Sequence, residues 1–178
     1  MTSRERPRTY IGDDRKEGLL EAAHAEFATS GYHGATTAQI AKRAGISQSY
    51  VYALFPSKKD LFLACQRRNH QRILRILDSA GAAVDEVEAQ VLLREQYLKK
   101  VQDDRVDFLF RLQVSAAATD PDIAAEERRS AMAIFDRLMP LFGNDQEAVK
   151  TAMAVGLFTD MAIALGLPPK YWPTTYMN

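Results

Sequence analysis

Cysteine and histidine are scarce in this chain of 178 residues. Cys65 is the single cysteine, so no disulfide can form within the chain, and we expect its thiol to fill a seam between helices. The histidines His24, His33 and His70 stand alone, without the spacing of a metal site. No nucleophile–base set, carboxylate pair or Gly-rich phosphate loop stands out. These absences argue against an enzyme, a metal site and a cofactor.

A secretory signal and a membrane span are not expected either. The first residues are polar and include Arg4, Arg6 and Arg8, whereas a signal peptide needs an apolar segment. The only membrane-like stretch, residues 151–167, is too short to span a bilayer and contains Asp160. The sequence therefore predicts a cytoplasmic protein with no membrane partner, in which this stretch is a buried helix.

Charge is balanced overall, but the two signs are distributed unevenly along the chain. Residues 1–75 hold 13 Lys and Arg against 7 Asp and Glu, whereas residues 76–178 hold 10 against 16. A basic segment suits the phosphate backbone of a nucleic acid, which repels an acidic segment. The amino half is thus the expected nucleic-acid-binding end.

Helical periodicity recurs along the chain, and no segment reads as a strand. The pattern predicts long helices over about residues 14–30, 57–80, 84–101, 105–118, 121–140 and 145–165. Their expected starts carry capping residues, namely Asp14, Ser57, Asp120 and Asn144. The fourth of these helices is apolar almost all round, which predicts central burial. The expected fold class is all-α.

Residues 36–58 have the pattern of a helix-turn-helix. Thr36 and Gln39 form a capping box that opens a first short helix. Gly45 follows where a sharp turn favours positive φ, and Ser47 caps a second helix. The amino end of that second helix is polar and uncharged, as base readout requires. An ordinary helical hairpin is the alternative, and the agreement of cap and turn signals argues against it.

The same segment is similar to the amino-terminal domain of TetR-family (tetracycline-repressor-like) transcriptional regulators. The resemblance rests on Thr-Thr-x-x-Ile-Ala-x-x-Ala-Gly-Ile-Ser from Thr36 and on Val-Tyr-x-x-Phe-Pro-Ser-Lys-x-x-Leu from Val51. The preceding helix fits as well, with Leu-Leu-x-Ala-Ala-x-x-x-Phe-x-x-x-Gly-Tyr from Leu19. The resemblance implies a DNA-binding domain over residues 1–62, with a basic arm at 1–12, and a helical ligand-binding and dimerisation domain over 63–178.

The expected partner of the motif is double-stranded DNA. Because the amino end of the second motif helix enters the major groove, the predicted base-reading side chains are Gln48, Ser49 and Tyr50. The family resemblance assigns phosphate contacts to Thr37, Tyr52 and Lys58. Tyr52 could instead be a core aromatic residue. The arginines of the arm could enter a minor groove or form a plain disordered tail.

The family resemblance further implies a homodimer on a palindromic operator, formed through residues 121–140 and 145–165. Small residues that would allow close helix packing recur along the second segment, namely Ala148, Ala152, Gly156 and Thr159. These residues could instead pack within one subunit. Asp160 needs a partner in this apolar stretch; an ion pair at the interface is the first interpretation, and a ligand contact is the second.

A small-molecule ligand is the last expectation. The large side chains that could line an apolar cavity, or simply form the core, are Tyr97, Phe108, Phe110, Leu112, Met132 and Phe135. With the family resemblance, the preferred function is a transcriptional repressor released by a small apolar ligand. The alternative is a helical DNA-binding protein whose carboxy-terminal domain only dimerises or docks another protein. The aromatic tail, residues 170–178, is expected to dock on its own or a partner's surface.

Overall fold

A computed structural model describes residues 8–83, 85–103 and 105–173. These residues form helices and no strand, which confirms the all-α prediction. In chain order the elements are α1 (Arg8–Gly34), α2 (Thr37–Ala44), α3 (Gln48–Leu54), α4 (Lys58–Ala80), α5 (Glu86–Asp103), α6 (Arg105–Ala116), α7 (Pro121–Leu138), the 3-10 helix η1 (Met139–Phe142), α8 (Gln146–Leu165) and the 3-10 helix η2 (Pro169–Tyr171).

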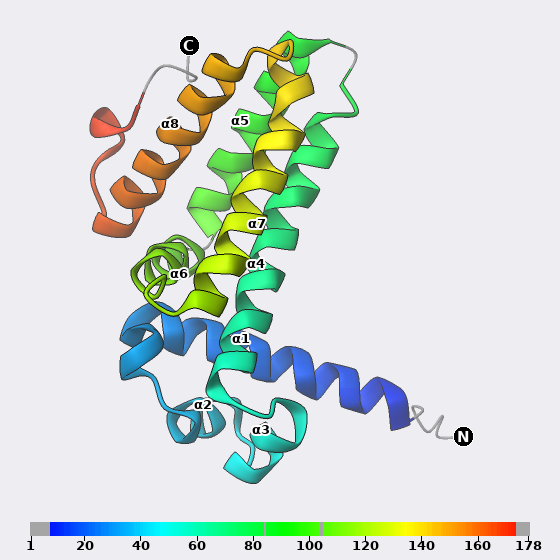
Figure 1. Ribbon diagram of the computed structural model, residues 1–178, viewed down its shortest axis with the longest axis vertical. Coiled ribbons are helices and arrows are strands. Elements are labelled where there is room, and N and C mark those ends of the chain that lie inside the picture. The colour runs from blue at the N-terminus through cyan, green and yellow to red at the C-terminus, as the bar shows by residue number, and fades with distance from the viewer. Residues whose placement is uncertain (1–7, 84, 104, 174–178) are drawn as a thin grey trace, which may run out of the picture.

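The helices form a head and a bundle (Figure 1). At one end of the molecule α1, α2 and α3 make up the head, and α4 runs out of it into the bundle with α5, α7 and α8. The short helix α6 lies across the junction, where it packs on α1 and on α8. The 23 residues of α4 span about 35 Å at 1.5 Å per residue. A single helix therefore connects the head with the far part of the bundle.

Local cap geometry explains most of the helix starts. The Ser57 side chain accepts a hydrogen bond from the backbone N–H of Asp60 and opens α4. The Asp120 side chain accepts from the N–H groups of Asp122 and Ile123, directly before a proline at the first helical position of α7. Both predicted caps are confirmed.

Two other predicted caps are wrong. Asp14 lies inside α1, which begins at Arg8, so residues 8–12 of the predicted basic arm are helical. The cap of α8 is Asp145, whose side chain accepts from the N–H groups of Glu147 and Ala148. Asn144 cannot take this place because its φ is 60°, whereas a residue at an N-cap has an extended backbone.

The apolar core has two parts. The first joins the head to α4 and α6 through the buried rings of Phe27, Phe62 and Phe110, with ring centroids 4.9 Å and 5.5 Å apart along this series. Cys65 is fully buried in it, as expected of a residue in a helix seam. The second part lies in the bundle, between α4, α5, α7, η1 and α8. The helix α6 contributes to the first part and thus packs directly on the head.

The helix α8 (Gln146–Leu165) occupies the predicted segment. Its 20 residues are long and apolar enough to cross a membrane by length and composition, and 33% of the apolar window is buried within the structure. Asp160 interrupts the apolar surface and forms an ion pair inside the bundle. The apolar side chains that remain exposed on α8 therefore form a surface that one subunit does not cover.

Candidate nucleic-acid interface and cavity

The helix-turn-helix has the geometry that its sequence predicts. Thr36 accepts from the N–H of Gln39 while the Gln39 side chain accepts from the Thr36 backbone, which completes the capping box of α2. Gly45 ends α2 in the left-handed conformation, with φ 66° and ψ 31°. The Ser47 side chain then caps α3 by accepting from the N–H of Tyr50 at 3.2 Å. The turn is thus fixed by side chains and backbone of the motif itself.

The amino end of α3 faces away from the core. Gln48 and Ser49 are exposed, and Tyr50 is partly exposed. The Gln48 side-chain amide donates a hydrogen bond of 2.8 Å to the Thr37 hydroxyl. Gln48 must release this bond, or share it, if its amide is to reach a base edge. The three side chains remain predicted readers of sequence, with Gln48 held back toward α2.

Three predicted phosphate-contacting residues gather around the amino end of α2. Thr37 is buried and shares a hydrogen bond of 3.0 Å with the hydroxyl of Tyr52. Tyr52 is 48% exposed, so it is not a core aromatic residue. The Lys58 ammonium donates to the Ala35 carbonyl at 3.0 Å and lies 4.9 Å from the ring centre of Tyr32. A hydroxyl and an ammonium thus flank the N–H groups of a helix start, where anions bind favourably.

The basic arm can be compared with the structure only in part. Arg4 and Arg6 lie outside the described residues, and Arg8 is the first residue of α1. Tyr176, the last aromatic residue of the tail, also lies outside the described residues. Within the described part of the tail, the Trp172 indole donates to the Leu167 carbonyl at 2.9 Å, so this segment folds back on the end of α8.

A buried polar contact joins the head to α6. Nε2 of His24 in α1 lies 2.8 Å from Oδ1 of Asp107 in α6, and Nη1 of Arg72 in α4 lies 3.2 Å from the same oxygen. The ring centroid of His24 is 4.3 Å from that of Phe110. His24 stands alone in the sequence because both partners are distant along the chain. Three helices therefore meet at one carboxylate between head and bundle.

A second ionic contact ties the head to α7. The Lys59 ammonium lies 2.7 Å from Oδ2 of Asp122 and 3.1 Å from Oδ2 of Asp120. The hydrogen bond to Asp122, and to a smaller extent the one to Asp120, raises the pKa of Lys59 above its usual value. The amino end of α4 and the amino end of α7 are thus held together at the surface.

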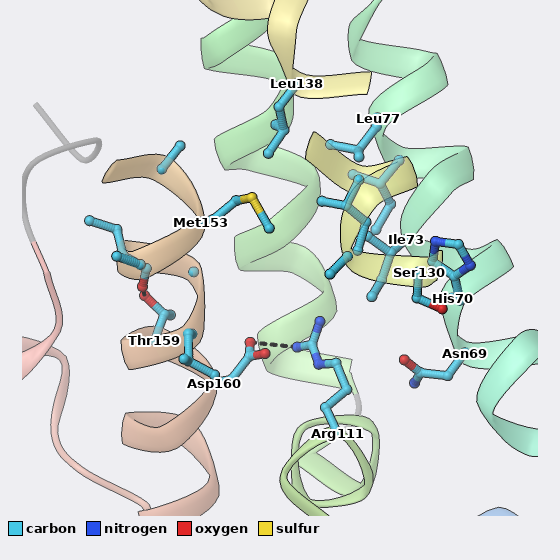
Figure 2. A pocket seen from close by; sticks show the side chains of 18 of the residues that line it. Asn69, His70, Ile73, Leu77, Arg111, Ser130, Leu138, Met153, Thr159 and Asp160 are labelled. Carbon is cyan, nitrogen blue, oxygen red and sulfur yellow. Dashed lines mark hydrogen bonds and ion pairs between the residues drawn. The ribbon is translucent and has the colours of Figure 1, made fainter. Parts of the chain in front are cut away.

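The bundle contains a cavity of about 540 Å³ between α4, α6, α7 and α8. This volume lies within the range of about 300–1,000 Å³ for small-molecule sites. Figure 2 shows Ile73, Leu77, Leu138 and Met153 along its apolar part. Nη2 of Arg111 lies 2.6 Å from Oδ1 of Asp160, and both residues line the cavity. Asp160 was expected to form an ion pair at the dimer interface or to contact a ligand. In the structure its ion-pair partner is an arginine of the same subunit, at the wall of the cavity.

The predicted ligand-contacting residues occupy different places. Phe110 and Leu112 line the cavity. Phe108 is buried beside it, with the Arg111 guanidinium 4.6 Å from its ring centre, and Phe135 packs in the second part of the core. Met132 is 67% exposed on α7. The side chain of Tyr97 lies outside the described residues.

The predicted dimer residues face inward in the subunit. Ala152, Gly156 and Thr159 line the cavity, and Ala148 packs against the second part of the core. The opposite face of α8 is formed by exposed residues at three- to four-residue steps, namely Phe158, Met161 and Leu165. We call these three residues the outer face of α8. Their spacing places them on one stripe of the helix.

The fold and the exposed motif define a helix-turn-helix DNA-binding protein with a helical carboxy-terminal domain. Residues 19–65 match the family described as bacterial regulatory proteins, tetR family. The HTH-type transcriptional activator FasR of Mycolicibacterium smegmatis is 29% identical over 164 residues, which cover 90% of this chain and 73% of FasR. The HTH-type transcriptional repressor AcnR of Corynebacterium diphtheriae is 33% identical over 67 residues, 38% of this chain and 35% of AcnR. The crystal structure of a transcriptional regulator from Rhodococcus sp. Rha1 superposes with a TM-score of 0.71 at 26% identity, covering 91% of this chain and 89% of that one.

These similarities agree with the motif and with the arrangement of the helices. Residues 19–65 form the DNA-binding domain of the tetR family of bacterial regulatory proteins, and the chain is a DNA-binding transcription regulator. The family resemblance of the helix-turn-helix and the helix before it is thereby confirmed, and the similarity in fold covers most of the chain.

Proposed function

We propose that this regulator is a cytoplasmic repressor, without catalytic activity, that binds a palindromic operator as a homodimer and leaves it when a small, mostly apolar ligand enters the cavity. The observation that carries this proposal is the contact between cavity and head. Phe110 lines the cavity, and its ring stacks near that of His24 in α1. A ligand that displaces α6 therefore acts directly on the first helix of the head.

The proposed DNA contacts divide into two kinds. Gln48, Ser49 and Tyr50 would read base edges from the amino end of α3, because this end of a recognition helix enters the major groove. Tyr52 and Lys58 would hold phosphates beside the start of α2, where Tyr52 is 48% exposed. Thr37 would orient Tyr52 and Gln48, since its hydroxyl is bonded to both. Phosphate contacts fix the register, and the three α3 side chains supply the specificity.

The proposed dimer forms through the outer face of α8. Its apolar side chains are exposed in the subunit, and Met132 adds an exposed apolar side chain on α7. Two copies related by a two-fold axis would bury the same surface on each subunit. This assignment replaces the small residues of α8, which face the cavity or the core of the subunit, by the opposite stripe of the same helix. Residues 121–138 and 146–165 keep the role that the family resemblance implies.

The proposed release mechanism is a change in the position of the head. Binding to a palindrome requires both recognition helices at a fixed separation, with half-site centres about 34–36 Å apart or a multiple of this. A ligand that prefers a displaced α6 lowers operator affinity by its differential binding, and allosteric couplings are typically about 1–3 kcal/mol. The operator must weaken ligand binding by the same factor.

Activation is a second candidate, and one finding favours it. FasR, which is similar to 90% of this chain, is named a transcriptional activator, whereas the match to the repressor AcnR covers 38% of it. In an activator, a ligand in the same cavity would stabilise the DNA-binding position of the two heads through the contact between α6 and α1. The direction of the ligand effect on operator affinity separates the two candidates.

The test begins with selection of bound fragments from random-sequence DNA by the full-length chain. Repression predicts an enriched palindrome, a protein dimer on each site and compounds that lower the affinity for it. Compounds that raise this affinity would establish activation instead. Enrichment of one isolated half-site by a protein that stays monomeric at micromolar concentration would overturn the dimeric mechanism. A cavity ligand that leaves operator affinity unchanged would remove its regulatory role.

A further inference from the structure

The cavity has a polar end and an apolar end. Because α4 and α7 run parallel, with their amino ends toward the head, Gln66 and Asn69 on α4 lie near Ser130 on α7 at the head-proximal end of the cavity. Farther along the bundle the same two helices contribute apolar side chains, among them Ile73, Leu77, Ile134 and Leu138. Figure 2 shows Asn69, His70 and Ser130 on one side of the polar end and the Arg111–Asp160 pair on the other.

The polar end contains buried groups that no neighbouring side chain satisfies. Asn69 is 4% exposed and Ser130 is 5% exposed. Within the described residues, Nδ2 of Asn69, Oγ of Ser130, Oε1 of Gln66 and Nε2 of His70 have no hydrogen-bond partner. A buried polar atom without a partner costs about 1–3 kcal/mol, so a cluster of them at one end of a cavity indicates a molecule that bonds to them.

A ligand that satisfies these groups must offer both a hydrogen-bond donor and a hydrogen-bond acceptor. Asn69 Nδ2 can only donate, and the Ser130 hydroxyl can donate or accept. Gln66 offers an acceptor, because its amide nitrogen already donates to Glu127 at 2.9 Å. Burial lowers the pKa of His70, which favours the neutral imidazole. A hydroxyl or a primary amide both donates and accepts, and it therefore complements this set.

The charges at this end argue for an uncharged head group. Arg111 and Asp160 neutralise one another at 2.6 Å. Glu127 also lines the cavity, and its carboxylate repels an anionic head. Glu127 would attract an ammonium head, but such a head carries only donors, so it would lose its hydration and still leave the Asn69 amide nitrogen without an acceptor. An ion of either sign is therefore disfavoured against a neutral hydrogen-bonding group.

We infer that the cavity binds an uncharged amphipathic molecule, with a hydrocarbon body between Ile73, Leu77, Ile134 and Leu138 and a hydroxyl or amide head between Asn69 and Ser130. This inference rests on the proposed function only in taking the cavity as the effector site. It defines the effector by its polar group. That group would lie at the end of the cavity nearest to Phe110 and to the DNA-binding helices α1, α2 and α3.

The experiment compares four ten-carbon compounds that differ only in the head group: 1-decanol, decanamide, decanoate and decylammonium. Binding to the full-length chain without DNA is measured at pH 7.5 by calorimetry and by the fluorescence of Trp172, which directly precedes the cavity-lining residue Pro173. We expect the alcohol and the amide to bind at least about tenfold more tightly than either ion. Equal binding of all four, tightest binding of an ion, or binding of none would overturn the inference.

Variants locate the head group. Ser130→Ala and Asn69→Leu should each weaken 1-decanol by about fivefold, the effect of one hydrogen bond, and should change decanoate less. Ser79→Ala is the matched control, because its hydroxyl accepts from Gln96 on the outside of α4. If both cavity variants bind 1-decanol as the wild type does, the polar end does not hold the head.

The two proposals fail differently. Loss of the head-group preference while other compounds still release the operator would refute the neutral head and leave ligand-controlled regulation standing. Preferential binding of the neutral compounds without any change in operator affinity would support the head-group assignment and refute the proposed regulation.

Discussion

Replacing Asp107 by alanine is expected to destabilise the protein through the contact between α1 and α6. The Asp107 side chain is 2% exposed, and its Oδ1 lies close to both His24 and Arg72. The substitution removes a carboxylate and leaves these two groups facing a site that water reaches poorly. Breaking a buried ion pair from one side costs about 3–5 kcal/mol. Because Arg72 keeps part of its surface in solvent, we expect the lower end, about 3 kcal/mol.

Urea unfolding followed by circular dichroism measures this loss. Asp136→Ala is the matched control, since Asp136 is an exposed carboxylate on α7 and its removal should change stability by less than about 0.5 kcal/mol. A double-mutant cycle with His24→Ala separates the direct contact from general loosening, and we expect a coupling of about 0.5–3 kcal/mol. Asp107→Ala as stable as the control, or a coupling of zero, would refute the role assigned to this contact.

Three further predictions concern the interfaces and the core. Lys58→Ala should weaken binding to all DNA sequences alike and lower the salt slope by about 0.9, while Gln48→Ala should alter base preference by about 1–3 kcal/mol. Fluorescence anisotropy with labelled DNA at several salt concentrations measures the affinity of both variants, with Lys150→Ala in α8 as the control. If Lys58→Ala changed the base preference and left the salt slope of binding unchanged, the assignment of Lys58 to a phosphate would be wrong. Phe158→Asp should convert a dimer to a monomer in analytical ultracentrifugation; an intact dimer would place the interface elsewhere. Burial raises the pKa of the Cys65 thiol to about 12, so iodoacetamide at pH 8 should alkylate it only after unfolding, and rapid reaction of the folded chain would disprove this.

The helix-turn-helix could be predicted in detail because its determinants are local. The capping box at Thr36, the glycine turn and the Ser47 cap each involve residues within four positions of one another. The cap of α8 shows where this reasoning fails. Asn144 and Asp145 are both good capping residues, and the choice between them depends on the backbone that leaves η1, where Gly143 and Asn144 both have positive φ. Asp145 is the first residue there with an extended backbone.

The polar groups of the site could not be predicted, because they come from distant segments. Asn69 and His70 stand in a run of polar residues on α4, from Gln66 to Arg72, which resembles a solvated helix face. Ser130 on α7 has the same appearance among charged neighbours. Only the packing of α4 against α7 turns these positions inward. The contact between His24 and Asp107 was missed for the same reason, since no spacing rule connects α1 with α6.

The helix α8 shows how an almost uniformly apolar sequence can serve two surfaces. Periodicity identified its small residues as a packing stripe, and this stripe faces the cavity and the core of the subunit in the structure. The larger side chains of the outer face are exposed, which gives them the character of an interface. If both proposals hold, one helix touches the ligand on one side and the second subunit on the other. A ligand that shifts α8 then changes the angle between the subunits as well as the position of α6, and both changes alter the separation of the two recognition helices.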